Sequence, residues 1–433
     1  MSVLRGLYSL LMWLAQPLLR RKLARRGAAE PVYLQAVQER FGYYDAPSGA
    51  GFIWLHAVSL GETRTAAILI KQLRQRLPGM RLLLTNGTAT GRAEGAGLLQ
   101  PGDIQVWQPW DTPGAVQRFL QHFKPRIGVL LETEVWPNLA AACRQAGVPL
   151  VLANARLSEK SLRNALRLAW IAKPAYRSLA AVWAQTEIGA QRLRQLGAPV
   201  SAVFGNLKFD AAPDAAQIAQ GKAWRAACGR PVILLASSRE GEEAQFLQIL
   251  QSIRAEAQAV HTQVATESIA NKVQWLIVPR HPQRFEEVAA LIERHGLSVS
   301  RRSAWASQPQ AADVWLGDSL GEMALYYGLA DVALLGGSFE PLGGQNLIEA
   351  AACGCPVVMG PSTFNFAQAA RLAEAAGAAR RADSMAVALQ TALALTRDAP
   401  GRTAMAERGT GFAAAHRGAA DKTAAAVVAL LGS

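Results

Sequence analysis

The first half of the chain contains a turn whose residue types could catalyse proton transfer. In the stretch from His56 to Glu62, an apolar segment breaks through Gly61 and a glutamate heads a helical pattern. A carboxylate at a helix N-terminus is stabilised as the anion by the helix dipole and the free amide groups. Such an anion can accept a proton from an incoming hydroxyl. The alternative is that Glu62 only caps its helix, which explains the glutamate but does not require Gly61 or Ser59.

Two further turns carry charged residues after apolar runs. Glu132 and Glu134 follow residues 127–131, and carboxylates two positions apart at a strand terminus point to the same side. Like charges that approach closely raise one pKa unless a cation intervenes. Because Glu132 ends a buried strand, we favour a site role over that of a surface acid. Lys208 is either a compact positive charge facing a ligand or a solvated lysine.

Basic and glycine-rich turns follow the apolar segments of the second half. Arg280 lies between two prolines that stiffen its turn, at a position where a phosphate would approach. Glycine-rich turns before helices expose N–H groups that bind anions, and Glu349 could bond ribose hydroxyls. The candidate binding residues at these turns are Arg280, Gly321, Glu322, Gly336, Gly337, Ser338, Asn346 and Glu349.

Two successive series of short apolar strands and amphipathic helices must position these turns. The predicted strands cover residues 52–57, 81–85, 104–107, 127–131, 150–153, 181–184, 202–204, 231–236, 275–279, 297–300, 314–316, 332–335 and 357–359. The predicted helices include residues 65–77, 114–123, 138–146, 240–253, 284–294, 320–327, 347–352 and 366–375. This alternation is typical of parallel α/β sheets. It predicts two doubly wound domains, each binding ligands at its strand C-termini, with a cleft between them.

Composition shifts along the chain predict the domain boundaries. The predicted parts are an N-terminal membrane-associating segment (1–26), a first domain (27–210), a linker poor in β-branched residues (211–230), a second domain (231–403) and a helical tail (404–433). Residues 261–270 are polar and are interpreted as a loop insertion on the second domain.

The N-terminal segment combines an apolar stretch with concentrated positive charge. The chain has a formal net charge of +13, and residues 1–26 hold six basic residues and no acid. Between Arg5 and Arg20 lie fourteen uncharged residues, too few to span a bilayer unaided, and no cleavage site of a signal peptide follows. Such a segment can lie in the membrane interface with its arginines on anionic headgroups. The alternative is a core helix with a basic flank.

Several function classes lack their sequence signatures. There is no GxxxxGK[ST] loop and no GxGxxG after the first strand, which argues against P-loop enzymes and dehydrogenases. No helix-turn-helix, RNP or zinc-finger pattern is present, so we expect no nucleic-acid partner. The four cysteines lack the paired spacing of a zinc site and are expected to be reduced thiols. The sequence therefore predicts no metal and no cofactor, and no motif indicates an oligomeric state.

Taken in order, eight motifs resemble those of the 3-deoxy-D-manno-octulosonic acid (Kdo) transferases. They are HAVSLGE (56–62), ETEVWPN (132–138), NARLS (154–158), GNLKFD (205–210), PRHP (279–282), GDSLGE (317–322), GGSFE (336–340) and NLIEAAACGCPVVMGP (346–361). The resemblance runs from residue 4 to about residue 380 and includes the apolar N-terminal anchor. It implies the GT-B arrangement of two Rossmann-like domains.

The resemblance also implies a reaction. The family moves Kdo from CMP-Kdo to the lipid A precursor, lipid IVA, at the cytoplasmic face of the Gram-negative inner membrane. Glu62 matches the family's proton acceptor, and Glu132 and Lys208 match positions assigned to transition-state stabilisation. By the same resemblance, the family's CMP-contacting segments include Pro279, Arg280, Leu320, Gly321, Glu322, Asn346, Leu347, Ile348 and Glu349. Arginine, lysine and helix N-termini can stabilise the leaving phosphate without a metal, and a base on the opposite face gives inversion.

Two other interpretations explain part of the sequence. A heptosyl or N-acetylglucosaminyl transferase of the GT-B type would share the glycine turns of the second half but not ETEVWP or GNLKFD. A non-enzymatic protein that binds a membrane surface or nucleic acid would explain the charge. It would leave the acidic residues at the strand ends without a purpose.

Overall fold

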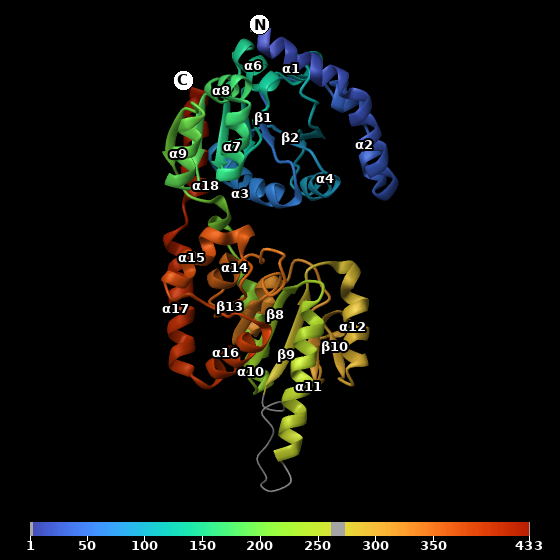
Figure 1. The fold of residues 1–433 in the computed structure, drawn as a ribbon, viewed down its shortest axis with the longest axis vertical. Coiled ribbons are helices and arrows are strands. Elements are labelled where there is room, and N and C mark those ends of the chain that lie inside the picture. Colours follow the sequence, from blue (N-terminus) through green and yellow to red (C-terminus); the bar gives the residue numbers. More distant parts are fainter. Residues whose placement is uncertain (1–2, 261–272, 433) are drawn as a thin grey trace. The chain divides into compact units, whose positions relative to one another are not determined.

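The structure, a computed structural model, describes residues 3–260 and 273–432. It divides into two compact units, each built around its own parallel sheet of seven strands with helices on both faces (Figure 1). Unit 1 comprises Met1–Asp210 and His416–Ser433, and unit 2 comprises Ala211–Ala415. The prediction of an α/β protein with two doubly wound domains is confirmed. The predicted loop insertion at residues 261–270 lies outside the described residues.

The sheet of unit 1 has the strand order β3-β2-β1-β4-β5-β6-β7. Its strands are β1 (Ile53–His56), β2 (Leu82–Asn86), β3 (Ile104–Trp107), β4 (Ile127–Leu131), β5 (Leu150–Ala155), β6 (Ala181–Ala184) and β7 (Val200–Val203). The order reverses between β1 and β4, which are hydrogen-bonded neighbours. Ligands of doubly wound sheets bind at such a switch point, outside the carboxyl ends of the strands.

Helices cover the two faces of this sheet and close a separate core on each. They are α3 (Leu60–Arg76), α4 (Ala89–Ala96), α5 (Pro113–Phe123), α6 (Pro137–Gln145), α7 (Glu159–Arg167), α8 (Ala169–Arg177), α9 (Glu187–Gln195) and α18 (Ala419–Gly432). On one face, Trp54 of β1 packs edge-on against Phe119 of α5. On the other face, Leu69 of α3 and Val427 of α18 share a core. Each fully buried side chain of this size contributes about 1.5–3 kcal/mol.

The sheet of unit 2 repeats this plan with the order β10-β11-β9-β8-β12-β13-β14. Its strands are β8 (Val232–Ser238), β9 (Gln274–Pro279), β10 (Val299–Arg301), β11 (Val314–Leu316), β12 (Val332–Leu335), β13 (Val357–Met359) and β14 (Ala379–Arg381). Its helices are α10 (Ala215–Cys228), α11 (Glu242–Val260), α12 (Phe285–Arg294), α13 (Met323–Leu329), α14 (Leu347–Ala352), α15 (Ala367–Ala375), α16 (Met385–Arg397) and α17 (Ala399–Ala415). Here the switch point lies between β8 and β12.

The N-terminal segment forms α1 (Val3–Leu14) and α2 (Gln16–Ala29), which belong to unit 1. The side of α1 that meets the unit is polar, because Tyr8 donates to Asp111 (2.9 Å) and Ser9 donates to Asn138 (2.9 Å). Its apolar residues face outward and are about half exposed, or more: Leu4, Leu7, Leu10, Leu11, Trp13 and Leu14. None of the helices in the described part of the chain combines the length and hydropathy needed to cross a membrane.

Two predicted boundaries are wrong. The predicted linker, residues 211–230, is part of unit 2, because α10 packs along α13 and Trp224 is buried there. The predicted tail, residues 404–433, is divided between the units. Its first part continues α17 in unit 2, whereas α18 returns to unit 1 and packs on α3.

Element ends differ from prediction where short-range contacts decide them. Helix α3 begins at Leu60, not at residue 65, because Ser59 caps it. Helix α13 begins at Met323, not at residue 320. Strand β14 is missed by the sequence reading because it is three residues long and two of them are arginines.

Candidate functional site

Glu62 occupies the first turn of α3, directly after β1. The hydroxyl of Ser59 accepts the N–H of Glu62 (3.4 Å), and the Glu62 carboxylate accepts the N–H of Val58 (2.6 Å). This reciprocal arrangement resembles a capping box, so Glu62 does cap its helix. Burial raises the pKa of Glu62 to about 7, although the Val58 bond lowers it. The expected stabilisation of the anion by the helix terminus is therefore outweighed by desolvation.

Glu132 is held just beyond the end of β4 in a left-handed conformation with φ of 59°. Its N–H donates to the carbonyl of Ala153 (3.1 Å), and its carbonyl accepts the N–H of Arg156 (3.1 Å). Both partners come from the chain that forms and follows β5, so β5 fixes this backbone. The side chain is only 4% exposed. Strand β4 ends at Leu131 as predicted, so Glu132 lies in the turn that follows it.

Two cations neutralise the buried Glu132 carboxylate. The Nε atom of Arg156 lies 2.7 Å from its Oε2, and the Nζ atom of Lys208 lies 3.4 Å from its Oε1. Lys208 is held in η3 (Leu207–Asp210), whose first N–H donates to the side chain of Asn154 (3.1 Å). The predicted pair Glu132 and Lys208 is therefore in contact, and Lys208 is not a solvated linker lysine.

Glu62 belongs to the same group of charges. The negative charges of Glu132 and Glu134 raise its pKa, whereas Arg156 lowers it. Glu134 is itself half-buried, and burial raises its pKa. Because β1, β4 and β5 are adjacent strands, their carboxyl ends bring these residues together at the switch point of unit 1.

Arg156 is the residue of this charged group that the sequence-based prediction did not identify. It lies in the quoted motif NARLS, but no role was assigned to it. Arg156 directly follows a buried strand, which is a signal for a site residue. The strand was predicted to end at residue 153, however, so this position was not recognised. Strand β5 extends to Ala155, so Arg156 lies at the carboxyl end of the strands, beside Glu132.

In unit 2, a buried carboxylate organises the turns on both sides of the switch point. Glu242 is fully buried and accepts N–H groups from Arg239 (2.9 Å), Gly337 (2.7 Å) and Phe339 (3.0 Å). The turn after β8 is thereby tied to the turn after β12. The sequence reading placed Glu242 inside a helix over residues 240–253 and gave it no role. Its position shortly after the end of β8 was a signal for a site role that the prediction did not use.

The glycine turn after β12 requires its residue types. A Cβ on Gly336 would collide with the carbonyl oxygen of Ser237, and Gly337 has a φ of 69°. Ser338 is fully buried, donates to the carbonyl of Leu335 and accepts the N–H of Gly360 (2.7 Å). Ser338 therefore fixes the turn to its neighbours instead of facing solvent.

The turn after β9 gathers positive charge. Pro279 is the last residue of β9, and the N–H of Arg280 donates to the carbonyl of Ser238 (3.0 Å). His281 is half-exposed, and its pKa is lowered by burial and by the nearby Arg239 and Arg280. The β9 turn thus places Arg280 next to the turn after β8, which carries Arg239.

The segment 346–349 contributes two polar residues and two core residues. Asn346 caps α14 by accepting the N–H of Ile348 (3.2 Å). Leu347 and Ile348 are buried, so their side chains pack in the core. Glu349 and Arg280 both act on the buried Tyr327, whose pKa is raised mainly by burial and by the Glu349 charge, and lowered by Arg280. Arg280 and Glu349 are therefore close to the same side chain.

The remaining predicted residues lie in the turn before α13. Leu320 is 70% exposed, and Gly321 has a φ of 79°. The carboxylate of Glu322 pairs with Arg302 (2.8 Å). Within residues 3–260 and 273–432, no cluster of three or more His, Cys, Asp or Glu side chains is placed to hold a metal ion.

The sequence of the chain is similar to a known family model and to known proteins. Residues 35–211 match the family model described as 3-deoxy-D-manno-octulosonic-acid transferase (kdotransferase). A 3-deoxy-D-manno-octulosonic acid transferase of Bordetella pertussis is 46% identical, covering 99% of this chain and all of its own length. A transferase of the same name from Haemophilus influenzae is 30% identical over 90% of each chain.

Solved structures agree on the fold. A crystal structure of HepE from Anabaena in complex with UDP matches with a TM-score of 0.55, covering 88% of this chain and 99% of its own. At 15% identity, this likeness concerns the fold alone.

Proposed function

The chain belongs to the 3-deoxy-D-manno-octulosonic acid (Kdo) transferase family, and we propose that it transfers Kdo from CMP-Kdo to lipid IVA with inversion and without a metal. It is a GT-B glycosyltransferase of lipopolysaccharide biosynthesis. The donor binds unit 2, and the acceptor hydroxyl is activated in unit 1.

The observation that carries the proposal is Glu62, a half-buried carboxylate at the switch point of unit 1 whose pKa is raised by burial to about 7. A general base works best when its pKa lies near the working pH. Glu62 takes the proton from the acceptor hydroxyl as the oxygen attacks the anomeric carbon of Kdo. The bond from that carbon to the CMP phosphate breaks, and CMP leaves with the electron pair. Attack from the face opposite the leaving group gives inversion.

The Glu132 group supports the charge changes of this step. The transition state is oxocarbenium-like, with positive charge at the anomeric carbon and negative charge growing on the phosphate. Glu132, kept in place by Arg156 and Lys208, offers a fixed carboxylate for the positive charge. The partly exposed Arg156 and Lys208 offer donors to the anionic groups of the substrates.

The turns of unit 2 support CMP binding without a metal. We assign the phosphate to Arg280, and we assign the ribose hydroxyls to Glu349, close to the same tyrosine. Gly336 lets the turn after β12 pack against the backbone of Ser237, and Gly337 allows the left-handed conformation of that turn, so both glycines shape the proposed binding surface. A single phosphate leaving group needs one or two cations, which side chains supply.

Helix α1 supports a location at the cytoplasmic face of the inner membrane, where the acceptor lipid resides. Its outward leucines and Trp13 form an apolar surface, and basic residues follow in α2. A helix of this kind lies in the interface with its apolar face among the lipids. We therefore propose a peripheral protein bound through α1 and α2 to anionic lipid.

Transfer from CMP-Kdo to lipid IVA in detergent, followed by mass spectrometry of the lipid, tests the proposal. The expected product carries added Kdo, and a chelator leaves the rate unchanged. Glu62→Gln keeps an oxygen for the Val58 N–H but removes the base, so we expect a rate loss of about 10²–10⁴-fold with CMP binding retained.

Glu159→Gln is the matched control, because Glu159 is an exposed helical residue of unit 1. Near-normal turnover of Glu62→Gln would exclude its role as the base. Absence of any Kdo on the lipid would exclude the proposed acceptor.

A further inference from the structure

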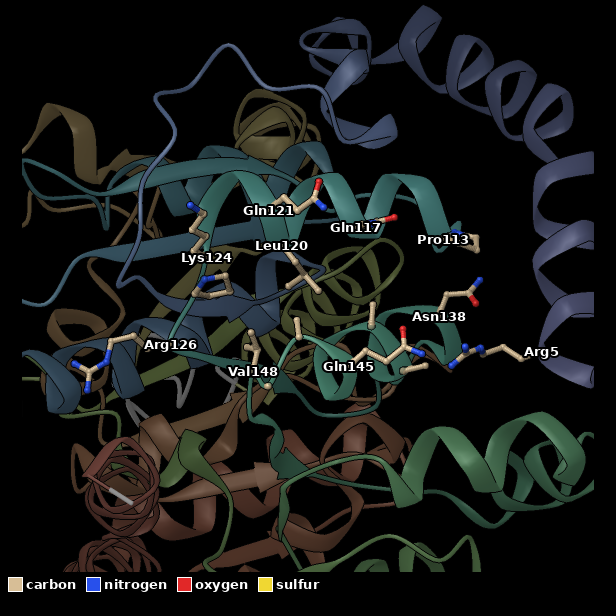
Figure 2. A pocket seen from close by; sticks show the side chains of 15 residues that line it. Arg5, Pro113, Gln117, Leu120, Gln121, Lys124, Arg126, Asn138, Gln145 and Val148 are labelled. Atoms are coloured by element: carbon tan, nitrogen blue, oxygen red, sulfur yellow. The ribbon is translucent and has the colours of Figure 1, made fainter. Parts of the chain in front are cut away.

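Unit 1 carries a groove along α5 and α6, with a cavity volume of about 750 Å³ (Figure 2). Its floor includes the aliphatic side chains of Leu120 and Val148. A volume of this size suits a small ligand or a headgroup. Neither Glu62, Glu132 nor Lys208 lines the groove, so it is separate from the site described above.

The groove is cationic at both ends. Arg5 of α1 extends toward Gln145 at one end, and Lys124 and Arg126 lie at the opposite end (Figure 2). None of the fifteen lining residues is acidic. Arg126 donates to the carbonyl of Leu431 (3.2 Å), which ties its guanidinium to α18. A ligand that matches this pattern carries negative charge at two separated points.

Carboxamide side chains line the groove between these charges. Gln117 and Gln121 project from α5, and Gln145 belongs to α6. Each carboxamide offers donors and an acceptor, so hydroxyl groups between the two anionic points of a ligand would find partners here.

The groove reaches the helix whose apolar face is turned outward. Arg5 belongs to α1, and the lining residue Asn138 accepts the hydroxyl of Ser9 (2.9 Å). Asn138 also donates to the carbonyl of Asp111 (2.7 Å), and the Asp111 carboxylate accepts the hydroxyl of Tyr8 (2.9 Å). These buried bonds fix α1, and with it Arg5, at one end of the groove.

We propose that this groove binds the headgroup of a membrane lipid, distinct from the acceptor of the transfer reaction, that carries two phosphates joined by glycerol. One phosphate meets Arg5, the other meets Lys124 and Arg126, and the glycerol bonds the glutamines. The acyl chains stay in the bilayer. The inference rests on the proposed membrane contact of α1, but not on the Kdo transfer reaction.

Flotation of the full chain with vesicles tests the headgroup preference. Cardiolipin has two phosphates joined by glycerol, and phosphatidylglycerol at equal surface charge has one per lipid. We expect about fivefold tighter binding to the cardiolipin vesicles, as for one additional cation–phosphate contact near a membrane.

Three variants separate the groove from general charge attraction. Lys124→Gln removes one cation, and Gln121→Trp fills the groove at an exposed helical position without changing charge. Both are expected to reduce the preference for cardiolipin to about onefold. Arg21→Gln removes an exposed charge of α2 outside the groove and is expected to keep it.

Equal binding of both vesicles by the wild type would overturn the proposal, as would a preference that survives in both groove variants. If a soluble bisphosphate such as fructose 1,6-bisphosphate binds in a Gln121-dependent manner while the vesicles show no preference, the lipid source is wrong. If neither vesicle is bound, both this inference and the proposed membrane contact fail. The detergent assay of Kdo transfer is scored independently.

Discussion

Two effects on the pKa of Glu62 oppose one another. The Val58 N–H stabilises the carboxylate, but burial disfavours its charge by more, and neighbouring carboxylates add to that effect. Glu62 is therefore expected to titrate near neutral pH and not in the usual range of a glutamate. Sequence reasoning identified the residue from its place after a strand but gave the wrong sign to its pKa shift, because burial depends on the folded surroundings.

The pH dependence of transfer follows from this pKa. The base must be deprotonated, so the rate should rise with pH and level off above about 7. Arg156→Ala removes a cation that lowers the pKa of Glu62, so the midpoint of the profile should move to higher pH. The measurement is kcat/KM for Kdo transfer against pH.

Arg163→Ala is the control for this shift, because Arg163 pairs with Glu159 on the exposed surface of α7. Its profile should match the wild type. A midpoint that stays in place in Arg156→Ala would show that Arg156 does not act on the base.

Other residues show what position along the sequence does and does not reveal. Glu132 and Lys208 were predicted because each follows an apolar strand. They meet because η3, which follows β7, returns to β5 through the bond of its first N–H to Asn154. Ser338, Leu347 and Ile348 share the predicted turns, yet their side chains are buried. Side-chain direction within a turn is set by backbone dihedrals, which the sequence pattern does not specify.

Among the elements, the turn between β12 and α14 depends on a partner that is distant in sequence. Glu242, at the start of α11, accepts two N–H groups from this turn. Such a contact follows from strand order, because β8 and β12 are neighbours although about a hundred residues separate them. Strand positions were predictable from apolar runs, but this pairing required the tertiary fold.

Removing the Glu242 carboxylate should disturb unit 2 in particular. In Glu242→Ala, buried N–H groups lose their acceptor, at about 1–3 kcal/mol for each unsatisfied group. We expect a lower unfolding temperature for unit 2 and weaker CMP binding. Thermal unfolding and titration calorimetry with CMP measure the two effects.

Glu240→Ala is the matched control two residues away, since the Glu240 side chain is 54% exposed and pairs with Arg239. It should change stability little, as exposed pairs contribute about 0–1 kcal/mol. Unchanged CMP affinity in Glu242→Ala would mean that the glycine turn is held by other contacts.

At the scale of the whole molecule, the chain enters unit 2 after Asp210 and leaves it after Ala415. The returning helix α18 packs on α3, and Ala419, Ala420 and Ala424 are buried there with Val427. The Asp210 carboxylate accepts the N–H of Ala420 (2.6 Å), which joins the two crossings within unit 1. Composition predicted closing helices in the tail but not their destination, because small apolar residues fit either core.

Truncation after Ala415 should therefore destabilise unit 1, although the rest of unit 1 lies far from the truncation in sequence. The loss of three buried methyl groups and one valine costs about 4 kcal/mol, and it falls on unit 1. Hydrogen exchange should increase in α3, whereas peptides of unit 2 should stay protected.

Asp421→Ala is the control, because it breaks only the exposed pair of Asp421 with Arg76. It should leave the exchange of α3 close to that of the wild type. Increased exchange confined to unit 2 in the truncated chain would contradict the assignment of α18.

The return of α18 also affects how the protein is made. Unit 2 is one continuous stretch, so it can fold on the ribosome as soon as residue 415 has left the exit tunnel. Unit 1 is begun before unit 2 but completed after it, because α18 follows unit 2 along the chain. During synthesis the nascent chain therefore exposes the apolar outer face of α1 while unit 1 is still incomplete. Chaperones or the bilayer have time to bind this face before unit 1 is complete.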